Sequence, residues 1–342
     1  MVIERISIEN FGVFDKIEID FCEGVNVFIG ENSTGKTTLL KFLYAWCNAD
    51  INKQEKILGN IPEEMKPKVL KDFWENPSYP KSEFAWVFEF FRFYQRDSNR
   101  LDYFKKETSI KIDPYNPNEK QKTPSIFIPT KEMLSHTRGF PDHYEKYNLP
   151  FDNTQIDIIK NARINETRKL TPLAEKLLTV VSKIIDGEVL YENDTFYIVK
   201  TNGLKIPFSM EAEGFCKFGM IWRLLRNGLF DEPGTVLLWD EPEANLNPKL
   251  IPVLVDILLE LARGGVQIFL ATHDCRLARY FSLKAEKDEV MFHNLYKGKE
   301  DKAIYHESAH RYTDLKHNAI EDAEEEFGDF AIKKAIEEIE NV

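Results

Sequence analysis

The sequence contains few cysteines and no long apolar run. Its only cysteines, Cys22, Cys47, Cys216 and Cys275, lie far apart, and no two of them form a CxxC pair. This spacing suits neither a zinc site nor a disulfide framework and favours a reducing compartment. No stretch of about 18 apolar residues is present, so no membrane-spanning helix is expected. The opening residues MVIERISIENFG have no apolar signal core, and we therefore expect a cytoplasmic protein without membrane contact.

An excess of positive charge is also missing. The chain carries 45 Lys and Arg against 57 Asp and Glu, for a formal net charge of −12. General binders of nucleic acid gather Lys and Arg in patches, so this class is disfavoured. Basic residues do gather between 53 and 106, diluted by nearby acids, and DNA therefore stays open as a partner. With 43% hydrophobic residues, the chain can bury a substantial core in one large domain or two modest ones.

Apolar strands alternate with amphipathic helices along the chain, which is typical of an α/β fold with a parallel sheet. Pro172 suits the first turn of a helix, and Asn193-Asp194 suits a tight hairpin. We expect strands over 3–8, 17–21, 25–29, 84–93, 109–112, 125–129, 189–191, 196–199, 236–239 and 266–271, and helices over 37–49, 172–185, 215–227, 248–262 and 319–339.

The segment GENSTGKT, from Gly30 to Thr37, fits the phosphate-binding pattern G-x-x-x-x-G-K-[ST] at every fixed position. A predicted strand precedes it and a predicted helix follows, as the pattern requires. Lys36 would reach the β- and γ-phosphates, the Thr37 hydroxyl would hold Mg²⁺, and the helix N-terminus would face the same oxygens. The alternative is a chance glycine-rich turn. The predicted nucleotide-binding residues are Gly30, Glu31, Asn32, Ser33, Thr34, Gly35, Lys36, Thr37 and Thr38.

Two further strand ends carry polar side chains. VLLWDEPEANLNP ends an apolar strand in Asp240 and Glu241, where Asp240 would bind Mg²⁺ and Glu241 would polarise the attacking water. Two adjacent carboxylates at such a place repel each other unless a cation lies near. LATHD ends the next strand in His273, which could donate a hydrogen bond to the γ-phosphate. The alternatives are a solvated loop and a structural histidine.

The order of these segments resembles the ATP-binding cassette ATPases. The stretch IERISIENFGVFDKIEIDFCEGVNVFIGENSTGKTTLLKFL looks like the RecF/SMC branch, and this resemblance places Asn10 and Phe11 near the adenine. FIPTKEML and LLWDEPEANLNPKL are similar to small bacterial AAA-family ATPases of the AAA15 and AAA21 type, relatives of the ATPase half of OLD-family proteins and of ATPases in phage-defence operons. The resemblance implies an α/β P-loop NTPase fold of the ABC/SMC-head type.

The resemblance also implies a division of the chain. Residues 1–129 would form the first part of the ATPase core, with antiparallel strands beside the P-loop. Residues 130–228 would form a helical lobe, and residues 229–310 the second part of the core around a mixed sheet. An acidic helical tail would occupy residues 311–342.

In that branch two heads sandwich two ATP molecules, each between one P-loop and the signature segment of the other head. The candidate here is SMEAEGF (209–215), in which only Gly214 clearly matches and Glu213 replaces a small residue. The alternative is an ordinary acidic helix start. Asn245 stands where the family's D-loop lies, although Asn247 before Pro248 is also a good helix cap. The family has a glutamine between the core and the helical lobe, and this chain has no clear match to it. Thr130-Lys131-Glu132 follow the corresponding strand.

The remaining segments limit the role. No heptads suggest the long coiled-coil arms of SMC proteins, and from the short stretch after His273 we expect no OLD-type nuclease domain there. His306 and His310 have the i, i+4 spacing of a helical metal pair, but the acidic tail around them more often means a solvated face or a docking tail.

We therefore predict an ATPase that uses ATP and Mg²⁺, forms an ATP-sandwiched homodimer and regulates a separate effector such as a nuclease. The resemblance implies phage defence or DNA repair as its setting. A RecF-like ATPase that binds DNA structures, an ATP-binding scaffold with little turnover, and a transporter ATPase are the alternatives.

Overall fold

The structure is a computed structural model and describes residues 2–11, 13–47, 86–91, 105–113, 123–147, 153–298 and 303–340. Most of the basic cluster predicted between 53 and 106 lies outside these residues. The described part of the chain contains no helix that is long and apolar enough to cross a membrane.

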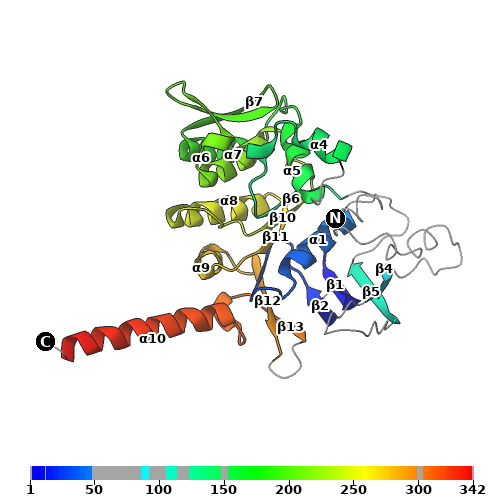
Figure 1. Ribbon diagram of the computed structural model, residues 1–342, viewed down its shortest axis with the longest axis vertical. Helices are drawn as coiled ribbons and strands as arrows, with labels where there is room; N and C mark the ends of the chain where they lie inside the picture. The colour runs from blue at the N-terminus through cyan, green and yellow to red at the C-terminus, as the bar shows by residue number, and fades with distance from the viewer. Residues whose placement is uncertain are drawn as a thin grey trace, which may run out of the picture.

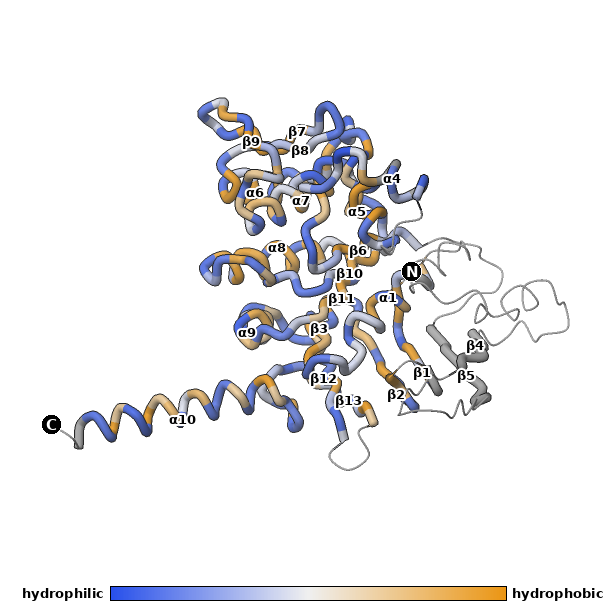
Figure 2. Tube along the Cα trace, in the orientation of Figure 1, coloured by the Kyte–Doolittle hydropathy of each residue, from blue (hydrophilic) through white to orange (hydrophobic). Residues whose placement is uncertain are grey.

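A six-stranded sheet forms the centre of the molecule (Figure 1). Its strands run in the order β13-β12-β3-β11-β10-β6, and all neighbours are parallel except the pair β12–β13. Strands β3, β10 and β11 at its centre are mostly hydrophobic, as Figure 2 shows, and every residue in them is buried because both faces of the sheet are covered there. The strands are β3 (Val25–Gly30), β6 (Ser125–Ile128), β10 (Val236–Asp240), β11 (Gln267–Ala271), β12 (Val290–Lys297) and β13 (Ile304–Ala309).

Alternate residues of the central strands face two different cores. Phe269 of β11 joins a core with helix α1 (Lys36–Cys47), whereas Ile268 and Leu270 join the core on the opposite face. Beyond α1 lies a second, antiparallel sheet in the order β2-β1-β5-β4. Its strands are β1 (Arg5–Phe11), β2 (Phe14–Asp20), β4 (Trp86–Phe91) and β5 (Lys105–Asp113).

Helices cover the opposite face and continue into a lobe that lies beyond strand β6 (Figure 1). Thr171 caps α6 by accepting a hydrogen bond from the Ala174 N–H, and Asn193 and Asp194 adopt positive φ angles in the hairpin between β7 and β8. The helices are α4 (Phe140–Tyr147), α5 (Asn153–Arg163), α6 (Pro172–Ile185), α7 (Glu213–Arg226), α8 (Ile251–Arg263) and α9 (Cys275–Lys284), and the lobe's small sheet comprises β7 (Gly187–Glu192), β8 (Thr195–Lys200) and β9 (Lys205–Pro207).

The C-terminal part differs most from the sequence prediction. Strands β12 and β13 and helix α9 were not predicted, and His306 lies on strand β13 rather than on a helix shared with His310. The helical i, i+4 arrangement that such a metal pair would need is therefore not formed, and the described residues contain no group of three or more His, Cys, Asp or Glu side chains placed to hold a metal ion. After the 3₁₀ turn Tyr312–Asp314, helix α10 (Ala319–Glu340) extends away from the body (Figure 1).

Candidate nucleotide-binding site

The GENSTGKT loop joins β3 to α1 at the end of the central sheet. Gly30 has a φ of +135°, and a Cβ on it would lie 2.1 Å from the Leu295 carbonyl oxygen of β12. Gly35 has a φ of +96°, and a Cβ there would lie 2.3 Å from the Phe14 ring of β2. Only glycine fits these two places, because both the backbone conformation and the available space exclude a side chain. The loop is thus held between strands of both sheets.

Lys36 folds its side chain back over this loop. Its Nζ atom donates hydrogen bonds of 2.8 Å to the carbonyl oxygens of Gly30 and of Glu31, and the residue is only 5% exposed. Burial lowers the pKa of Lys36 to about 8, against the opposing influence of Asp240 and Glu241. A buried ammonium group at a helix N-terminus favours an anion as its ligand.

Asp240 ends β10 directly beside the first turn of α1. The Thr37 hydroxyl lies 3.0 Å from both carboxylate oxygens of Asp240, and the Thr130 hydroxyl donates to Oδ2 at 3.1 Å. Asp240 is buried, and this burial raises its pKa despite the two hydroxyl contacts. A carboxylate and hydroxyl oxygens are hard donors of the kind that Mg²⁺ prefers, so these residues fit that ion.

Glu241 and His273 follow two neighbouring parallel strands and meet at the same edge of the sheet. Glu241 adopts a φ of +48°, and its N–H donates to the Ala271 carbonyl at 2.8 Å. Its Oε1 atom lies 3.6 Å from Nε2 of His273. Burial, helped by the positive charge of Lys36, lowers the pKa of His273. The structure therefore brings Lys36, Thr37, Asp240, Glu241 and His273 together at one sheet edge.

Glu243 and Thr272 complete this edge, and the sequence analysis missed both. The Thr272 hydroxyl donates to Oε1 of Glu243 at 2.7 Å, and the same oxygen accepts the His273 N–H at 3.4 Å. Glu243 is a partly buried carboxylate whose pKa is raised by burial. The sequence feature that could have indicated Glu243 is its position two residues after Glu241, in the loop that faces the end of β11. Glu243 thus ties the loop after β10 to the start of the His273 segment.

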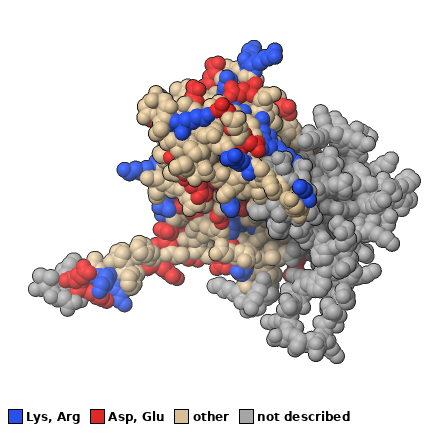
Figure 3. Space-filling model, turned by 45° about the horizontal axis from the view of Figure 1, so that its top comes forward, with Lys and Arg blue, Asp and Glu red and all other residues tan. Residues whose placement is uncertain are grey.

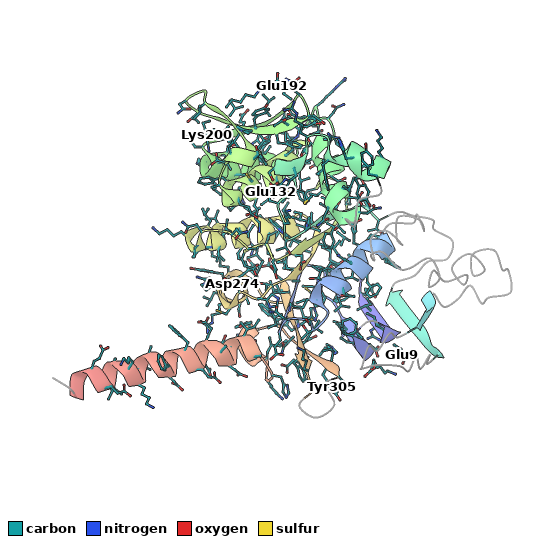
Figure 4. The ribbon with its side chains drawn as sticks, in the orientation of Figure 1. Glu9, Glu132, Glu192, Lys200, Asp274 and Tyr305 are labelled. Carbon is teal, nitrogen blue, oxygen red and sulfur yellow. The ribbon has the colours of Figure 1, made fainter. Side chains whose placement is uncertain are left out.

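Of the residues at 130–132, only Thr130 contacts the carboxylate at the sheet edge. The Glu132 carboxylate accepts the N–H groups of Leu134 and Ser135, at 2.6 and 3.0 Å, and so caps the short turn that follows. Figure 4 labels Glu132, and also Asp274, which caps helix α9 by accepting the N–H groups of Arg276 and Leu277. These two acidic side chains are explained by local backbone contacts.

The candidate signature segment contacts the candidate D-loop within the same chain. The Asn245 amide donates to Oε2 of Glu213 at 2.9 Å, and a Cβ on Gly214 would lie 3.4 Å from the Asn245 carbonyl oxygen. Lys217, one turn into α7, is buried and donates to the carbonyl oxygens of Glu241, Pro242 and Ala244, at 3.3, 3.5 and 2.6 Å. Helix α7 is therefore fastened to the loop that carries Glu241.

Other predicted residues have local partners or lie at the margin. Asn247 caps the turn Pro248–Leu250 by accepting the Lys249 N–H, as the capping alternative predicted. The Lys297 ammonium donates to the Asn32 carbonyl at 3.1 Å and lies 3.6 Å from the Glu31 carboxylate. Ser33 has a φ of +64°, the Thr34 hydroxyl donates to the Glu31 carbonyl, and Thr38 lies in the first turn of α1. Asn10 and Phe11 end β1, but their side chains lie outside the described part.

A known family model matches most of the chain. The family is described as "AAA domain, putative AbiEii toxin, Type IV TA system", and its model matches residues 25–278. This range begins at β3 and ends within α9, so it includes every element that forms the sheet edge described above.

Curated relatives are more distant. Over 218 residues the chain is 21% identical to the DNA replication and repair protein RecF of Thermoanaerobacter sp. (strain X514), with 60% of this chain and 55% of that protein covered. A match of 47 residues is 45% identical to RecF of Cytophaga hutchinsonii and covers 14% of this chain and 12% of that protein. The chain thus spans about half the length of the first relative and less of the second.

Among solved structures, the crystal structure of the SMC head bound to the C-winged helix domain of ScpA is similar. The TM-score is 0.50 at 12% sequence identity, and the match covers 90% of this chain and 98% of that chain. At this identity the likeness concerns the fold alone. It confirms the predicted α/β P-loop NTPase fold of the SMC-head type, with a mixed sheet at its centre.

Proposed function

The chain belongs to the AAA-domain family whose model it matches, and on that premise we propose that it is an ATP-dependent molecular switch. Two copies close on two ATP molecules, hydrolysis reopens the dimer, and this cycle regulates a separate effector in phage defence or DNA repair. The observation that carries the proposal is the meeting of Lys36, Thr37, Asp240, Glu241 and His273 at one sheet edge.

Each of these residues has a role that suits its surroundings. The Lys36 ammonium moves from the loop carbonyls to the β- and γ-phosphates, which are stronger acceptors for a cation. Thr37 and Asp240 would hold Mg²⁺, and the bound ion would neutralise charge on the phosphate oxygens. Glu241 accepts a proton from the attacking water, and His273, kept neutral by burial, donates a hydrogen bond toward the γ-phosphate.

The second copy would supply Gly214 and Asn245 to the nucleotide. Within one chain the two segments are already in contact, because the Asn245 amide donates a hydrogen bond to Glu213, the residue before Gly214. The Lys217 contacts support coupling between lobe and site, because any movement of α7 pulls on the carbonyls around Glu241. Glu213 brings a carboxylate toward the phosphates, and we therefore expect slow hydrolysis.

Phosphate release measured over a range of protein concentrations tests this function. Because the complete site needs two copies, the rate per chain should rise with protein concentration and then level off. The variant Glu241→Gln, of nearly the same shape, should lose this release while it retains ATP binding. A wild-type chain that binds ATP and releases no phosphate at any concentration is a scaffold, and that result would end the hydrolysis proposal.

A RecF-like role on DNA is the second candidate, and the similarity to RecF over 218 residues favours it. Its electrostatic basis would be the Lys and Arg residues between 53 and 106. Binding of duplex DNA with ATP present, stepped through increasing salt, tests it, since phosphate contacts weaken as counterions accumulate. Absence of salt-sensitive binding would exclude this role.

A further inference from the structure

The N-terminal end of helix α10 is fixed to the body. The Glu307 carboxylate of β13 accepts the N–H groups of Lys316 and His317, at 3.1 and 2.8 Å, just before the helix begins. Arg279 of α9 forms an ion pair of 2.5 Å with Glu321 in the first turn of the helix. Ile320 packs against the main core. These contacts fix the direction of α10, so the helix is presented by the body and is not a loose terminus.

Beyond that end the helix is exposed to solvent. From Asp322 to Glu338 every residue is exposed except Gly328, and Figure 3 shows the helix as an arm standing clear of the body. Phe327 and Phe330 lie three residues apart on one face and are 70% and 67% exposed. Neighbouring apolar positions on that face, together with these two, form what we call the phenylalanine surface: Ala323, Phe327, Phe330 and Ala331.

Two phenylalanine rings this exposed are unusual for a surface helix. Large aromatic side chains gain most from burial and anchor many protein interfaces. The core below α10 does not use them. The contacts between the helix and the body come from its first two turns, where Ile320 packs against the core, Glu321 pairs with Arg279 and Glu324 contacts Cys275. An apolar face with no partner inside the described part of the chain marks a docking surface for another molecule.

The charge of the helix selects among possible occupants. Nine of its residues are acidic against two lysines, a net charge of −7. A second copy of α10 would bring two such helices together and repel, and an anionic membrane surface would repel it as well. A basic helix with an apolar face has the opposite charge and the matching shape.

We propose that the phenylalanine surface of α10 docks a basic amphipathic helix of a separate protein. This proposal extends the proposed function. It rests on that function in one respect, which is that the docked protein is identified as the effector that the switch regulates. The two rings enter the apolar seam of the incoming helix, and its lysine or arginine side chains pair with the flanking Asp and Glu of α10. The effector thus attaches on the arm, away from the phosphate-binding loop.

A binding titration tests the surface directly. The probe is a fluorescent 21-residue peptide of Leu and Lys in heptad order, and the readout is its anisotropy with the full chain. The double variant Phe327→Gln, Phe330→Gln keeps every charge of α10, and we expect it to bind the probe about tenfold more weakly or worse. The matched control, Leu204→Gln with Leu283→Gln, removes two exposed leucines elsewhere (56% and 80%) and should bind as the wild type does.

Three results would overturn the inference. One is equal affinity of the phenylalanine variant and the wild type, which would leave only non-specific attraction between charges. Another is an equal weakening in the leucine control. The third is a Leu/Glu peptide of the same length that binds as tightly as the Leu/Lys peptide. Circular dichroism of each variant checks that α10 stays helical.

Photo-crosslinking distinguishes the occupants in the protein's own host. With benzoylphenylalanine at position 327, we expect a crosslink to another protein. The crosslinked peptide should form an amphipathic helix with one basic face and one apolar face. A crosslink only to a second copy of this chain would refute it. In the phenylalanine variant the ATP-bound dimer should still form, so failure of docking and failure of the switch are separable.

Discussion

Replacement of Lys36 by methionine tests the phosphate-binding assignment most quantitatively. The side chains are similar in length, but methionine has no charge and donates no hydrogen bonds. In the protein, the Lys36 ammonium makes two hydrogen bonds of 2.8 Å with loop carbonyls, and burial lowers its pKa to about 8. A triphosphate favours the charged form and should raise that pKa again.

The expected size of the effect follows from the hydrogen bonds to the phosphates that replace these two bonds when ATP binds. Charge-assisted hydrogen bonds contribute about 1.5–3 kcal/mol each, so removal of two such bonds to the phosphates weakens ATP binding about 100-fold or more at pH 7. Above pH 8 the free protein must take up a proton at Lys36 when it binds ATP. The wild-type affinity should therefore be nearly constant up to about pH 7, halve by about pH 8 and be about tenfold weaker at pH 9.

Titration calorimetry with ATP and Mg²⁺ at pH 7, 8 and 9 measures both effects. The wild type should lose affinity with rising pH, whereas Lys36→Met should bind weakly at all three values with no such slope. Proton uptake, seen as a dependence of the heat on the buffer, should accompany wild-type binding at pH 9. Equal affinity of both proteins, or the same pH slope in both, would refute the assignment of Lys36 to the phosphates.

Three further changes test neighbouring parts of the site. In Asp240→Asn, Mg²⁺ should no longer strengthen ATP binding in titrations with and without the ion; an undiminished Mg²⁺ effect would contradict the metal assignment. Glu243→Ala removes the acceptor of the His273 N–H and should slow phosphate release about tenfold with ATP affinity retained. Glu243→Gln keeps an acceptor oxygen and should release phosphate faster than the alanine variant. Equal rates of phosphate release in the two variants would count against positioning of His273 by Glu243. Gly30→Ala drives a Cβ into the Leu295 carbonyl and should lower the free energy of unfolding in urea by more than about 2 kcal/mol; an unchanged midpoint would show that the loop relaxes.

The part of the site carried by local pattern could be predicted from the sequence. A strand, a glycine-rich loop and a helix in succession place Lys36 and Thr37, and parallel neighbouring strands must end at one edge, which places Asp240 beside His273. These predictions depend on chain segments that are each internally consistent.

The missed features depend on long-range pairing. Strand β12 pairs with β3, which lies near the other end of the chain, and its buried His293 and Asn294 disguise the apolar pattern of a strand. His293 is stabilised there by contacts with Ser308 and Asn26, which no spacing rule reveals. In the sequence, the spacing of His306 and His310 is compatible with a helix. The pairing of β13 with β12, which places His306 on a strand, excludes that helix.

The most direct test of the switch is the molar mass of the Glu241→Gln variant by light scattering. Without hydrolysis, the closed state should accumulate in ATP and Mg²⁺ at twice the 40.0 kDa mass of the chain, and it should return to the single-chain mass in ADP. The same doubling should be absent when Lys36→Met is added to the variant. A mass that stays the same in ATP, ADP and no nucleotide would contradict the account.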